Sequence, residues 1–350
     1  MKVSKRIAFV LISIFTLITV LTLTVILSLY SSPNFFVWFL RQQPDAIATY
    51  VPEEYNVAKN DVLEILDITY ESKYKENKID VYYPKNYDNK KLPTIIWTHG
   101  GSFIGGDKSA IKVFGTLVAK EGYTFVSVNY ELAPENTYPG PAIQLTEVVK
   151  YLKKNINKYQ MIDLERVVIG GDSAGAQIAA HFVATQINSE LRDEVKIEQV
   201  LTPKEIKAVL LFCGPYDMNE LDKQFTGNNS NSSISNILSF FVKQIGWSYF
   251  GYSGWKSGNE IKQTNIVDQV TNDYPPTYLT DGNRISFMAH AESLEKKLDE
   301  LGVIVDSYYP SKEDSTKDFN HEYQFNFKDY PVEAFINLEY TLNFLKENIN

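Results

Sequence analysis

The segment Gly171-Asp172-Ser173-Ala174-Gly175 decides how this chain of 350 residues folds. It follows an apolar run at residues 167–169 and precedes a helical pattern at residues 174–187. The two glycines leave room for a tight strand-to-helix turn, where a Cβ would collide with neighbouring backbone. The N-terminus of the following helix directs N–H groups and a partial positive charge toward the turn, which favours an anion developing there. The segment therefore predicts a nucleophile elbow that exposes the Ser173 hydroxyl.

Strand and helix patterns alternate on both sides of this elbow. Apolar strand patterns lie at residues 65–70, 79–83, 94–97, 125–128, 208–212, 277–280 and 303–309. Helical patterns lie at residues 111–120, 142–155, 174–187, 286–301 and 332–345. Repeated strand–helix units predict an α/β fold with a mostly parallel central sheet and helices on both faces.

One long segment, residues 216–274, interrupts this alternation. It has no strand pattern, and it contains a strongly apolar patch at residues 237–250. One interpretation is an ordinary helical excursion that packs on the body. The other, which we favour, is a helical cap insertion whose apolar face lines an acyl pocket.

The N-terminal residues form a separate unit. Residues 7–29 are almost wholly apolar or Ser/Thr, which is longer than the roughly 20 residues that a helix needs to cross a bilayer. Lys2, Lys5 and Arg6 precede this run and predict a cytoplasmic N-terminus. A cleaved signal peptide is the alternative, but it would have a shorter apolar region and a small-residue cleavage site.

The chain is thus expected to be a single-pass protein of the cell membrane. The predicted order is a cytoplasmic tail at residues 1–6, a transmembrane anchor at 7–29, a juxtamembrane segment at 30–60 and an extracytoplasmic catalytic domain at 61–350. Aromatic residues just after the anchor are expected at the outer membrane interface; these are Phe35, Phe36, Trp38 and Phe39.

Composition excludes several classes of function. The net charge of −9 argues against nucleic acid as a partner. The only cysteine, Cys213, rules out an intramolecular disulfide and a cysteine-based zinc cluster, and we expect it to be a small buried residue. No residue spacing indicates a metal site or a phosphate-binding loop, so no cofactor is expected. The sequence carries no signal for an oligomeric state.

Three other segments accompany the elbow in an order that is typical of one enzyme family. They are the turn His99-Gly100-Gly101-Ser102-Phe103, the segment Asn129-Tyr130-Glu131-Leu132-Ala133-Pro134-Glu135, and His321 in a late loop. In this order the chain resembles the hormone-sensitive-lipase-type branch of the α/β hydrolases, which includes acetyl esterases, over roughly residues 60–350. The resemblance implies an α/β-hydrolase fold with Ser173 as nucleophile. It also implies an oxyanion hole formed by the backbone N–H groups of Gly100, Gly101 and Ala174. Ser102 replaces a glycine that is usual in this family.

A serine nucleophile needs a base, and a neutral imidazole with a pKa near 6.5 suits that task. Among the four histidines, His99 is expected to brace the oxyanion turn, His181 to point into packing, and His290 to lie on a helix surface. His321 alone occupies the late loop expected for the chain order Ser, acid, His. We therefore assign His321 as the base.

The position of the acid that would pair with His321 departs from the pattern of the related family. The related family has a Gly-Glu-x-Asp-like turn after the strand that follows the cap, but here that turn reads Thr280-Asp281-Gly282-Asn283-Arg284-Ile285. Asp281 is the first choice for the acid. Asp217, after the preceding strand, is the alternative, although a structural role in a turn suits it better. Asp172 and Glu135 are expected to be structural.

These residues predict a membrane-anchored serine hydrolase that cleaves small-molecule carboxylic esters through a Ser-His-acid triad and an acyl-enzyme. Because the acid position is unusual, a catalytically weak or inactive binding protein with the same fold is one alternative. An amidase or peptidase with the same triad is another.

Overall fold

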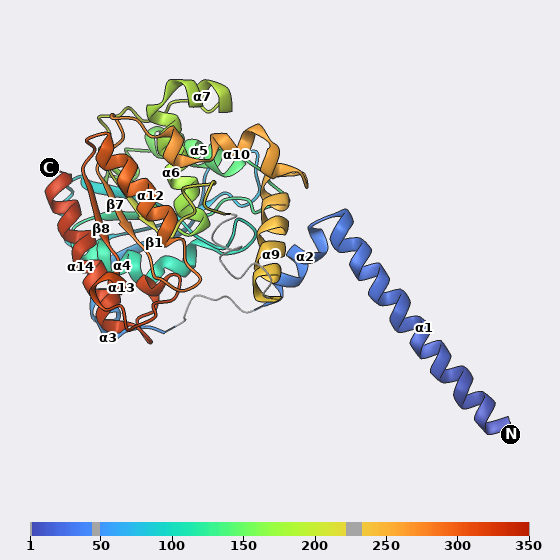
Figure 1. The fold of residues 1–350 in the computed structure, drawn as a ribbon. Coiled ribbons are helices and arrows are strands. Elements are labelled where there is room, and N and C mark those ends of the chain that lie inside the picture. Colours follow the sequence, from blue (N-terminus) through green and yellow to red (C-terminus); the bar gives the residue numbers. More distant parts are fainter. Residues whose placement is uncertain (1, 44–49, 222–232, 350) are drawn as a thin grey trace.

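A computed structural model describes residues 2–43, 50–221 and 233–349. It has an α/β body from which one long N-terminal helix projects (Figure 1). The body is built on one eight-stranded sheet with the strand order β1-β2-β4-β3-β5-β6-β7-β8. The strands are β1 (Val62–Thr69), β2 (Lys78–Pro84), β3 (Leu92–Thr98), β4 (Thr124–Val128), β5 (Ile162–Asp172), β6 (Ile206–Phe212), β7 (Thr277–Thr280) and β8 (Val305–Tyr308).

The pairing confirms the mostly parallel sheet. The pairs β1–β2 and β2–β4 are antiparallel, and every later pair is parallel. The central strands carry almost continuous apolar residues, such as Thr-Phe-Val-Ser-Val in the fully buried β4. Such runs are typical of strands that are covered on both faces. The elbow lies at the end of β5, in the middle of the sheet.

Helices cover both faces, and each face has its own apolar core. One core joins the sheet to α5 (Gly140–Lys154), α6 (Ala174–Ile187) and α12 (Met288–Glu300). The opposite core joins it to α4 (Lys112–Lys120) and α14 (Pro331–Asn348). Short helices complete the body: α3 (Glu53–Ala58), α7 (Ser189–Val195), α13 (Pro310–Glu313), and the 3₁₀ turns η1 (Lys108–Ile111) and η3 (Tyr323–Phe325).

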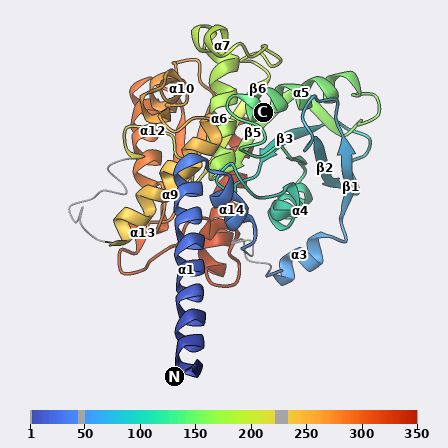
Figure 2. The same ribbon diagram turned by 90° about the vertical axis from the view of Figure 1, so that its right-hand side faces the viewer.

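The segment between β6 and β7 is helical, as the sequence predicts. It contains α9 (Ser233–Phe250), η2 (Trp255–Ser257), α10 (Asn259–Gln263) and α11 (Ile266–Gln269). Residues 222–232 of this predicted cap insertion lie outside the described residues. Helix α9 stands on the side of the body from which the N-terminal helix projects (Figures 1 and 2).

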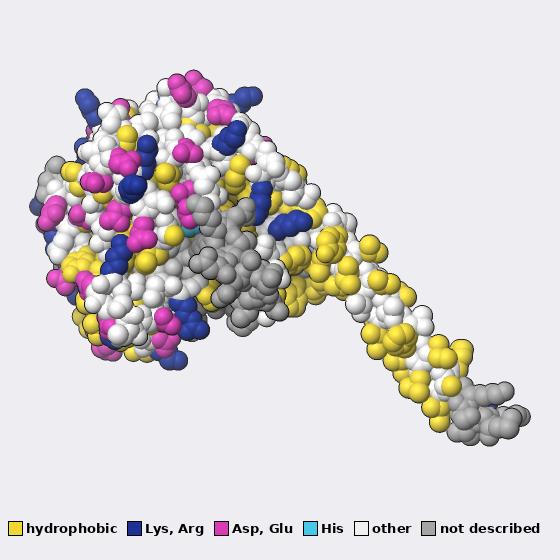
Figure 3. All heavy atoms as spheres, viewed as in Figure 1, with side chains coloured by type: hydrophobic (Ala, Val, Ile, Leu, Met, Phe, Trp, Pro, Cys, Tyr) yellow, Lys and Arg dark blue, Asp and Glu magenta, His cyan; other side chains and the backbone are white. Residues whose placement is uncertain are grey.

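The N-terminal helix α1 (Lys2–Ser31) is long enough and apolar enough to cross a membrane. Its span Arg6–Ser31 has a mean hydropathy of 2.7 and is not buried in the body. Hydrophobic side chains cover the visible part of this helix (Figure 3). One helix of this kind is compatible with a single-pass anchor or with a signal sequence.

A second helix, α2 (Asn34–Arg41), follows α1 after two residues and packs against α9. The sequence placed all the aromatic residues of this segment at a membrane interface, and for Phe36 that expectation is wrong. Phe36 is buried against Phe240 and Phe241, because the helical turn of α2 directs it toward the apolar side of α9. Trp38 and Phe39, by contrast, are half exposed.

Candidate active site

Ser173 occupies a strained turn between β5 and α6. Its backbone has φ 51° and ψ −119°, and its N–H donates to the Phe212 carbonyl at 2.7 Å. A Cβ added to Gly171 would stand 2.5 Å from the Gly175 carbonyl carbon, and one added to Gly175 would stand 2.1 Å from the Thr98 carbonyl oxygen. Both glycines are therefore required by close backbone approach, as expected for the elbow.

His321 reaches Ser173 from the loop that connects β8 with α14. Its Nε2 lies 2.9 Å from Ser173 Oγ, which is hydrogen-bond distance. The backbone N–H of His321 donates to the Arg284 carbonyl, which ties this loop to the turn after β7. The structure thus brings together a serine and a histidine that are 148 residues apart.

The carboxylate behind His321 belongs to Asp281, at the end of β7. Its Oδ1 lies 3.9 Å from His321 Nδ1, which is longer than a hydrogen bond. Its two oxygens instead accept the N–H groups of Gly282 and Phe287, each at 2.7 Å. His321 Nδ1 is buried and makes no hydrogen bond to any described residue. The imidazole therefore has a carboxylate behind it that it does not yet bind.

Asp217 lies elsewhere, beside His290. Its Oδ1 accepts the Asn219 N–H, which closes a turn after β6, and its own N–H donates to His290 Nδ1 at 3.2 Å. The expected surface position of His290 is wrong, since this side chain is fully buried. It lies on the face of α12 that carries Ala291 and Leu294 into the core, and burial lowers its pKa to about 4.

The other two histidines hold structural positions, as expected. His99 Nδ1 donates to the Gly100 carbonyl at 2.7 Å, and its ring stacks on Tyr130. His181 is buried in α6 with its Nε2 3.0 Å from the Tyr138 hydroxyl, and burial lowers its pKa to about 3.

A second carboxylate near His321, that of Glu322, is not singled out by the sequence. Its Oε1 lies 3.9 Å from His321 Nε2, on the side of the ring that faces Ser173. Burial alone would lower the pKa of His321, but Asp281, Glu322 and Asp172 outweigh burial and raise it. Only its position next to His321 in the sequence could have drawn attention to Glu322.

Asp172 braces the turn at residues 99–103 through two hydrogen bonds. Its Oδ1 accepts from Trp97 Nε1 at 2.7 Å, and its Oδ2 accepts from the Gly100 N–H at 2.8 Å. Burial, reinforced by Glu322, raises the pKa of Asp172. The Gly100 N–H is thus engaged by a side chain of the protein itself.

Other backbone N–H groups near Ser173, in the turn at residues 101–103 and at the start of α6, have no acceptor among the described residues. Gly101, Ser102 and Phe103 all have left-handed backbone, with φ of 112°, 55° and 64°. No described residue accepts a hydrogen bond from the N–H of Gly101 or Ser102. Ala174 is the first residue of α6, where backbone N–H groups have no partner within the helix.

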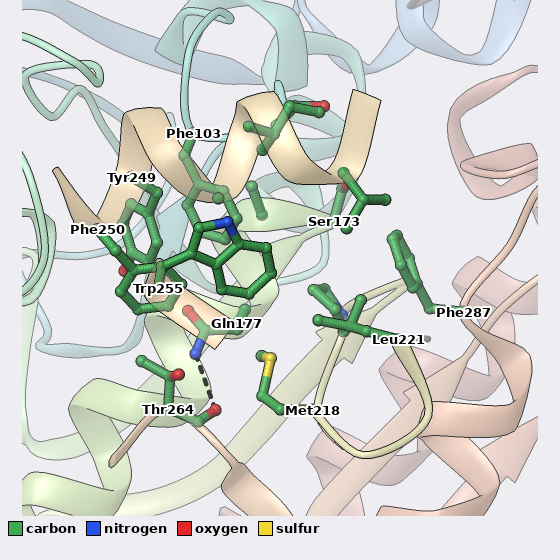
Figure 4. A pocket seen from close by; sticks show the side chains of 16 residues that line it. Phe103, Ser173, Gln177, Met218, Leu221, Tyr249, Phe250, Trp255, Thr264 and Phe287 are labelled. Carbon is green, nitrogen blue, oxygen red and sulfur yellow. Dashed lines mark hydrogen bonds between the residues drawn. The ribbon is translucent and has the colours of Figure 1, made fainter. Parts of the chain in front are cut away.

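Two cavities meet at Ser102 and Ser173. The first holds about 100 Å³, is almost wholly apolar, and lies between α6 and the cap (Figure 4). Its walls include Phe103, Gln177, Met218, Leu221, Ile245, Tyr249, Phe250, Trp255 and Phe287. The second holds about 510 Å³ and is more polar, with walls that include Tyr50, Tyr55, Gly101, Asp107, Lys112, His321 and Glu322.

Cys213 is buried, as expected, and lies close to Asp281 and His321. One ligand atom each of Cys213, Asp281 and His321 fall within 4.8 Å of one another. Burial raises the pKa of the Cys213 thiol far above its ordinary value, and its Sγ donates to Gln324 Oε1.

Comparisons with known proteins agree with this geometry. The BD-FAE family model matches residues 79–298. An esterase of Gibberella moniliformis is 29% identical over 241 residues, which cover 67% of this chain and 70% of that protein. An isoprenylcysteine α-carbonyl methylesterase of Arabidopsis thaliana is 28% identical over 158 residues, or 45% of this chain and 36% of that protein.

A solved structure shares the fold. Esterase B from Lactobacillus rhamnosis superposes with a TM-score of 0.65 at 21% identity, covering 83% of this chain and 90% of that one. With the elbow on a mostly parallel sheet and a family model that matches more than half of its length, the chain belongs to the BD-FAE family, within the esterases of the α/β-hydrolase fold.

Proposed function

We propose that this protein is a membrane-anchored serine hydrolase that cleaves carboxylic esters through an acyl-enzyme. The observation that carries the proposal is the 2.9 Å distance between Ser173 Oγ and His321 Nε2, at a strained elbow. The esterases among its relatives support the same reaction class.

In the proposed reaction, Ser173 Oγ attacks the ester carbonyl carbon while His321 Nε2 accepts the hydroxyl proton. The tetrahedral intermediate collapses as His321 returns that proton to the leaving alcohol. Water then attacks the acyl-enzyme, again with His321 as base, and releases the acid and free Ser173. Every proton transfer passes through His321 Nε2, so the reaction needs no second group that donates or accepts a proton.

The negative charge on the intermediate needs N–H donors. The Ala174 and Gly101 N–H groups keep the role that the sequence predicts. The Gly100 N–H already donates to Asp172, so we assign the third donor to the Ser102 N–H in place of the Gly100 N–H. Ser102 borders both cavities, and its N–H has no partner among the described residues. Donors that are fixed before the reaction stabilise developing charge strongly.

Asp281 is the acid in this proposal. A carboxylate behind Nδ1 holds the imidazole in the tautomer that leaves Nε2 free, and it stabilises the imidazolium. Closing the gap from 3.9 Å to hydrogen-bond distance needs a movement of about 1 Å. Formation of the imidazolium supplies the attraction for that movement.

Each of the two cavities holds one part of the ester substrate in this proposal. The apolar cavity between α6 and the cap accepts the acyl group, and its small volume favours short chains. The larger polar cavity accepts the alcohol, because His321 must protonate the leaving oxygen on that side.

The anchor in this proposal is α1. Its apolar span, and the basic residues before it, favour a cytoplasmic N-terminus and an extracytoplasmic body. Protease treatment of intact cells tests this orientation. A body that is protected until the cells are broken would contradict it.

The activity is tested with p-nitrophenyl acetate and butyrate, using the full chain in detergent. Wild type and the control Ser189→Ala, at an exposed serine on α7, are expected to hydrolyse both esters. Ser173→Ala is expected to lose at least about 10³-fold in kcat, because it removes the nucleophile. Wild-type turnover no higher than that of Ser173→Ala would favour the inactive binding protein. Faster cleavage of the matching p-nitroanilides would favour the amidase.

A further inference from the structure

The residue that joins the anchor to the catalytic machinery is Arg41, the last residue of α2. Its Nε donates to the Ile104 carbonyl at 2.8 Å, and its Nη2 donates to the Ala133 carbonyl at 2.9 Å. Its two terminal nitrogens also bind the two carboxylate oxygens of Glu135, each at 2.8 Å. The guanidinium is planar and presents its donors in a fixed fork, so these bonds set the relative positions of three backbone segments.

The two carbonyl groups that Arg41 binds belong to residues in contact with the proposed oxyanion turn, residues 99–103. Ile104 follows that turn, and its N–H donates to the Gly101 carbonyl. Ala133 is tied to the same turn, because its N–H donates to the Phe103 carbonyl at 2.9 Å. Arg41 therefore holds the segment that contains Ser102 directly at Ile104 and, through Ala133, at Phe103.

This segment needs a brace, because its backbone is strained. Ser102 and Phe103 are consecutive non-glycine residues with positive φ. Such conformations persist only where the surroundings hold them, and they relax when a support is removed. A relaxed turn would move the N–H groups of Gly101 and Ser102 away from the position that an oxyanion takes beside Ser173.

The same helix supports the acyl cavity from outside. Phe36 of α2 meets Phe241 of α9 edge-on with ring centroids 4.9 Å apart. About two turns further along α9 lies Tyr249, whose ring stacks on the Phe103 ring with centroids 3.9 Å apart. Phe103 and Tyr249 both line the cavity beside Ser173 (Figure 4). Helix α2 thus contacts the turn through Arg41 and the cap through Phe36.

We propose that Arg41 is a positioning residue for ester hydrolysis: from the helix next to the anchor, it fixes the oxyanion turn through the carbonyl groups of Ile104 and Ala133. The proposal rests on the proposed function. It places the boundary between anchor and catalytic domain before Asn34, since α2 belongs to the active-site support.

The test compares Arg41→Ala, Arg41→Lys and Glu135→Gln in the full chain, in detergent. Arg166→Ala is the matched control, because Arg166 also binds a carboxylate, Asp163, and a backbone carbonyl, Lys91, but does so at the other end of β5. Each variant is measured for kcat and KM with p-nitrophenyl butyrate, and for inhibition by a trifluoromethyl ketone. This inhibitor forms a tetrahedral adduct that needs the oxyanion donors.

Arg41→Ala is expected to lower kcat by about 10²-fold with KM nearly unchanged, because a displacement of about 1 Å at the reacting centre has that effect. The inhibition constant of the ketone should rise by a similar factor. Arg41→Lys should recover part of the loss, since one ammonium cannot bind all three partners. Glu135→Gln, which keeps both carbonyl bonds, should lose less than Arg41→Ala. Arg166→Ala should match wild type.

Hydrogen exchange gives a second readout that does not depend on activity. Arg41→Lys and Arg41→Ala should speed exchange in residues 99–106, and Arg166→Ala should not. If wild type is no more active than Ser173→Ala, the proposed function fails and exchange alone decides the role of Arg41. If wild type is active, then unchanged exchange, or a loss in Arg41→Ala that leaves ketone inhibition at the wild-type value, would overturn the proposal for Arg41.

Discussion

At the scale of single residues, His321 is the group of the site that lies closest to two carboxylates, those of Asp281 and Glu322. Carboxylates approach both of its ring nitrogens, Asp281 at Nδ1 and Glu322 at Nε2, each at 3.9 Å. Asp172 adds to their field, and together these groups raise the pKa of His321 against the effect of burial. In the proposed mechanism His321 must be neutral to accept a proton, so its raised pKa is expected to keep the enzyme inactive up to a higher pH.

Replacing Glu322 by Gln is therefore expected to shift the acidic limb of the kcat/KM profile to lower pH. The substitution removes one negative charge beside Nε2, which lowers the pKa of His321 and leaves it neutral over a wider range. The profile is measured with p-nitrophenyl acetate between about pH 4 and 9, which brackets the ordinary histidine pKa. Glu198→Gln, at an exposed glutamate, serves as control. A limb that stays in place or moves to higher pH would contradict this role of Glu322.

The choice of acid gives a second prediction at this scale. Asp281→Asn should lower kcat by about 10³- to 10⁴-fold, because the imidazole loses both its orientation and its counter-charge. Asp217→Asn should change kcat little, since Asp217 closes a turn beside His290. Thermal unfolding of both variants checks that the fold is kept. Full activity in Asp281→Asn would refute the assignment.

What the sequence could predict at this scale depends on how local each constraint is. Ser173 and His321 follow from a short motif and from chain order. The distance of Asp281 from His321 depends on how two loops meet, which no local pattern encodes. The engagement of the Gly100 N–H depends on Asp172 from another strand, so the donor set could not be assigned from the His-Gly-Gly turn alone.

At the scale of elements, α9 and η2 form one wall of the apolar cavity, which the proposed function assigns to the acyl group. Helix α9 packs closely on η2, since a Cβ at Gly246 would stand 2.1 Å from the Trp255 ring. Trp255 also stacks on Phe250 and donates to the Lys243 carbonyl. This wall is closely packed, whereas Met218, which also lines the cavity, is a flexible side chain that is only partly buried.

Met218→Ala is therefore expected to enlarge the acyl cavity and favour longer chains. Each additional methylene that it accommodates should raise kcat/KM by about four-fold relative to acetate, the equivalent of about 0.8 kcal/mol of burial. A series of p-nitrophenyl esters from acetate to octanoate measures the shift. Met288→Ala, at a methionine that does not line this cavity, is the control. An unchanged chain-length preference would show that the acyl group lies elsewhere.

The strands and most helices of the body could be predicted, because apolar periodicity reports burial directly. Helix α2 could not be placed in the same way. An aromatic run next to a membrane-length helix has the same pattern whether it faces lipid or protein. The rings that pack against Phe36 come from α9, about 200 residues later. The burial of His290 depends on a similar distant contact, with the loop that carries Asp217.

At the scale of the whole molecule, the apolar helix α1 and the body can be separated at one place. Residues 6–27 of α1 have no buried side chain, whereas the Leu29 carbonyl accepts from Gln244 of α9 at 3.1 Å. A chain that begins at Ser28 should leave the membrane and keep kcat/KM within about two-fold, since it retains α2 and its contacts. Carbonate extraction of membranes, followed by the ester assay, checks both expectations. A truncated chain that stays in the membrane fraction would contradict α1 as the anchor.

The link between α1 and α2 has a consequence for where the enzyme can work. Only Ser32 and Pro33 separate the two helices, and two residues reach about 7 Å at most. Helix α2 is in turn fastened to the body, so the serine cannot swing on a flexible tether. If α1 spans a bilayer, Ser173 would move with the protein in the plane of the membrane and stay at a nearly constant distance from its surface. Its accessible substrates would then be esters within a thin layer at that distance. In a thicker layer of ester-bearing material, only the esters at that distance would be cleaved.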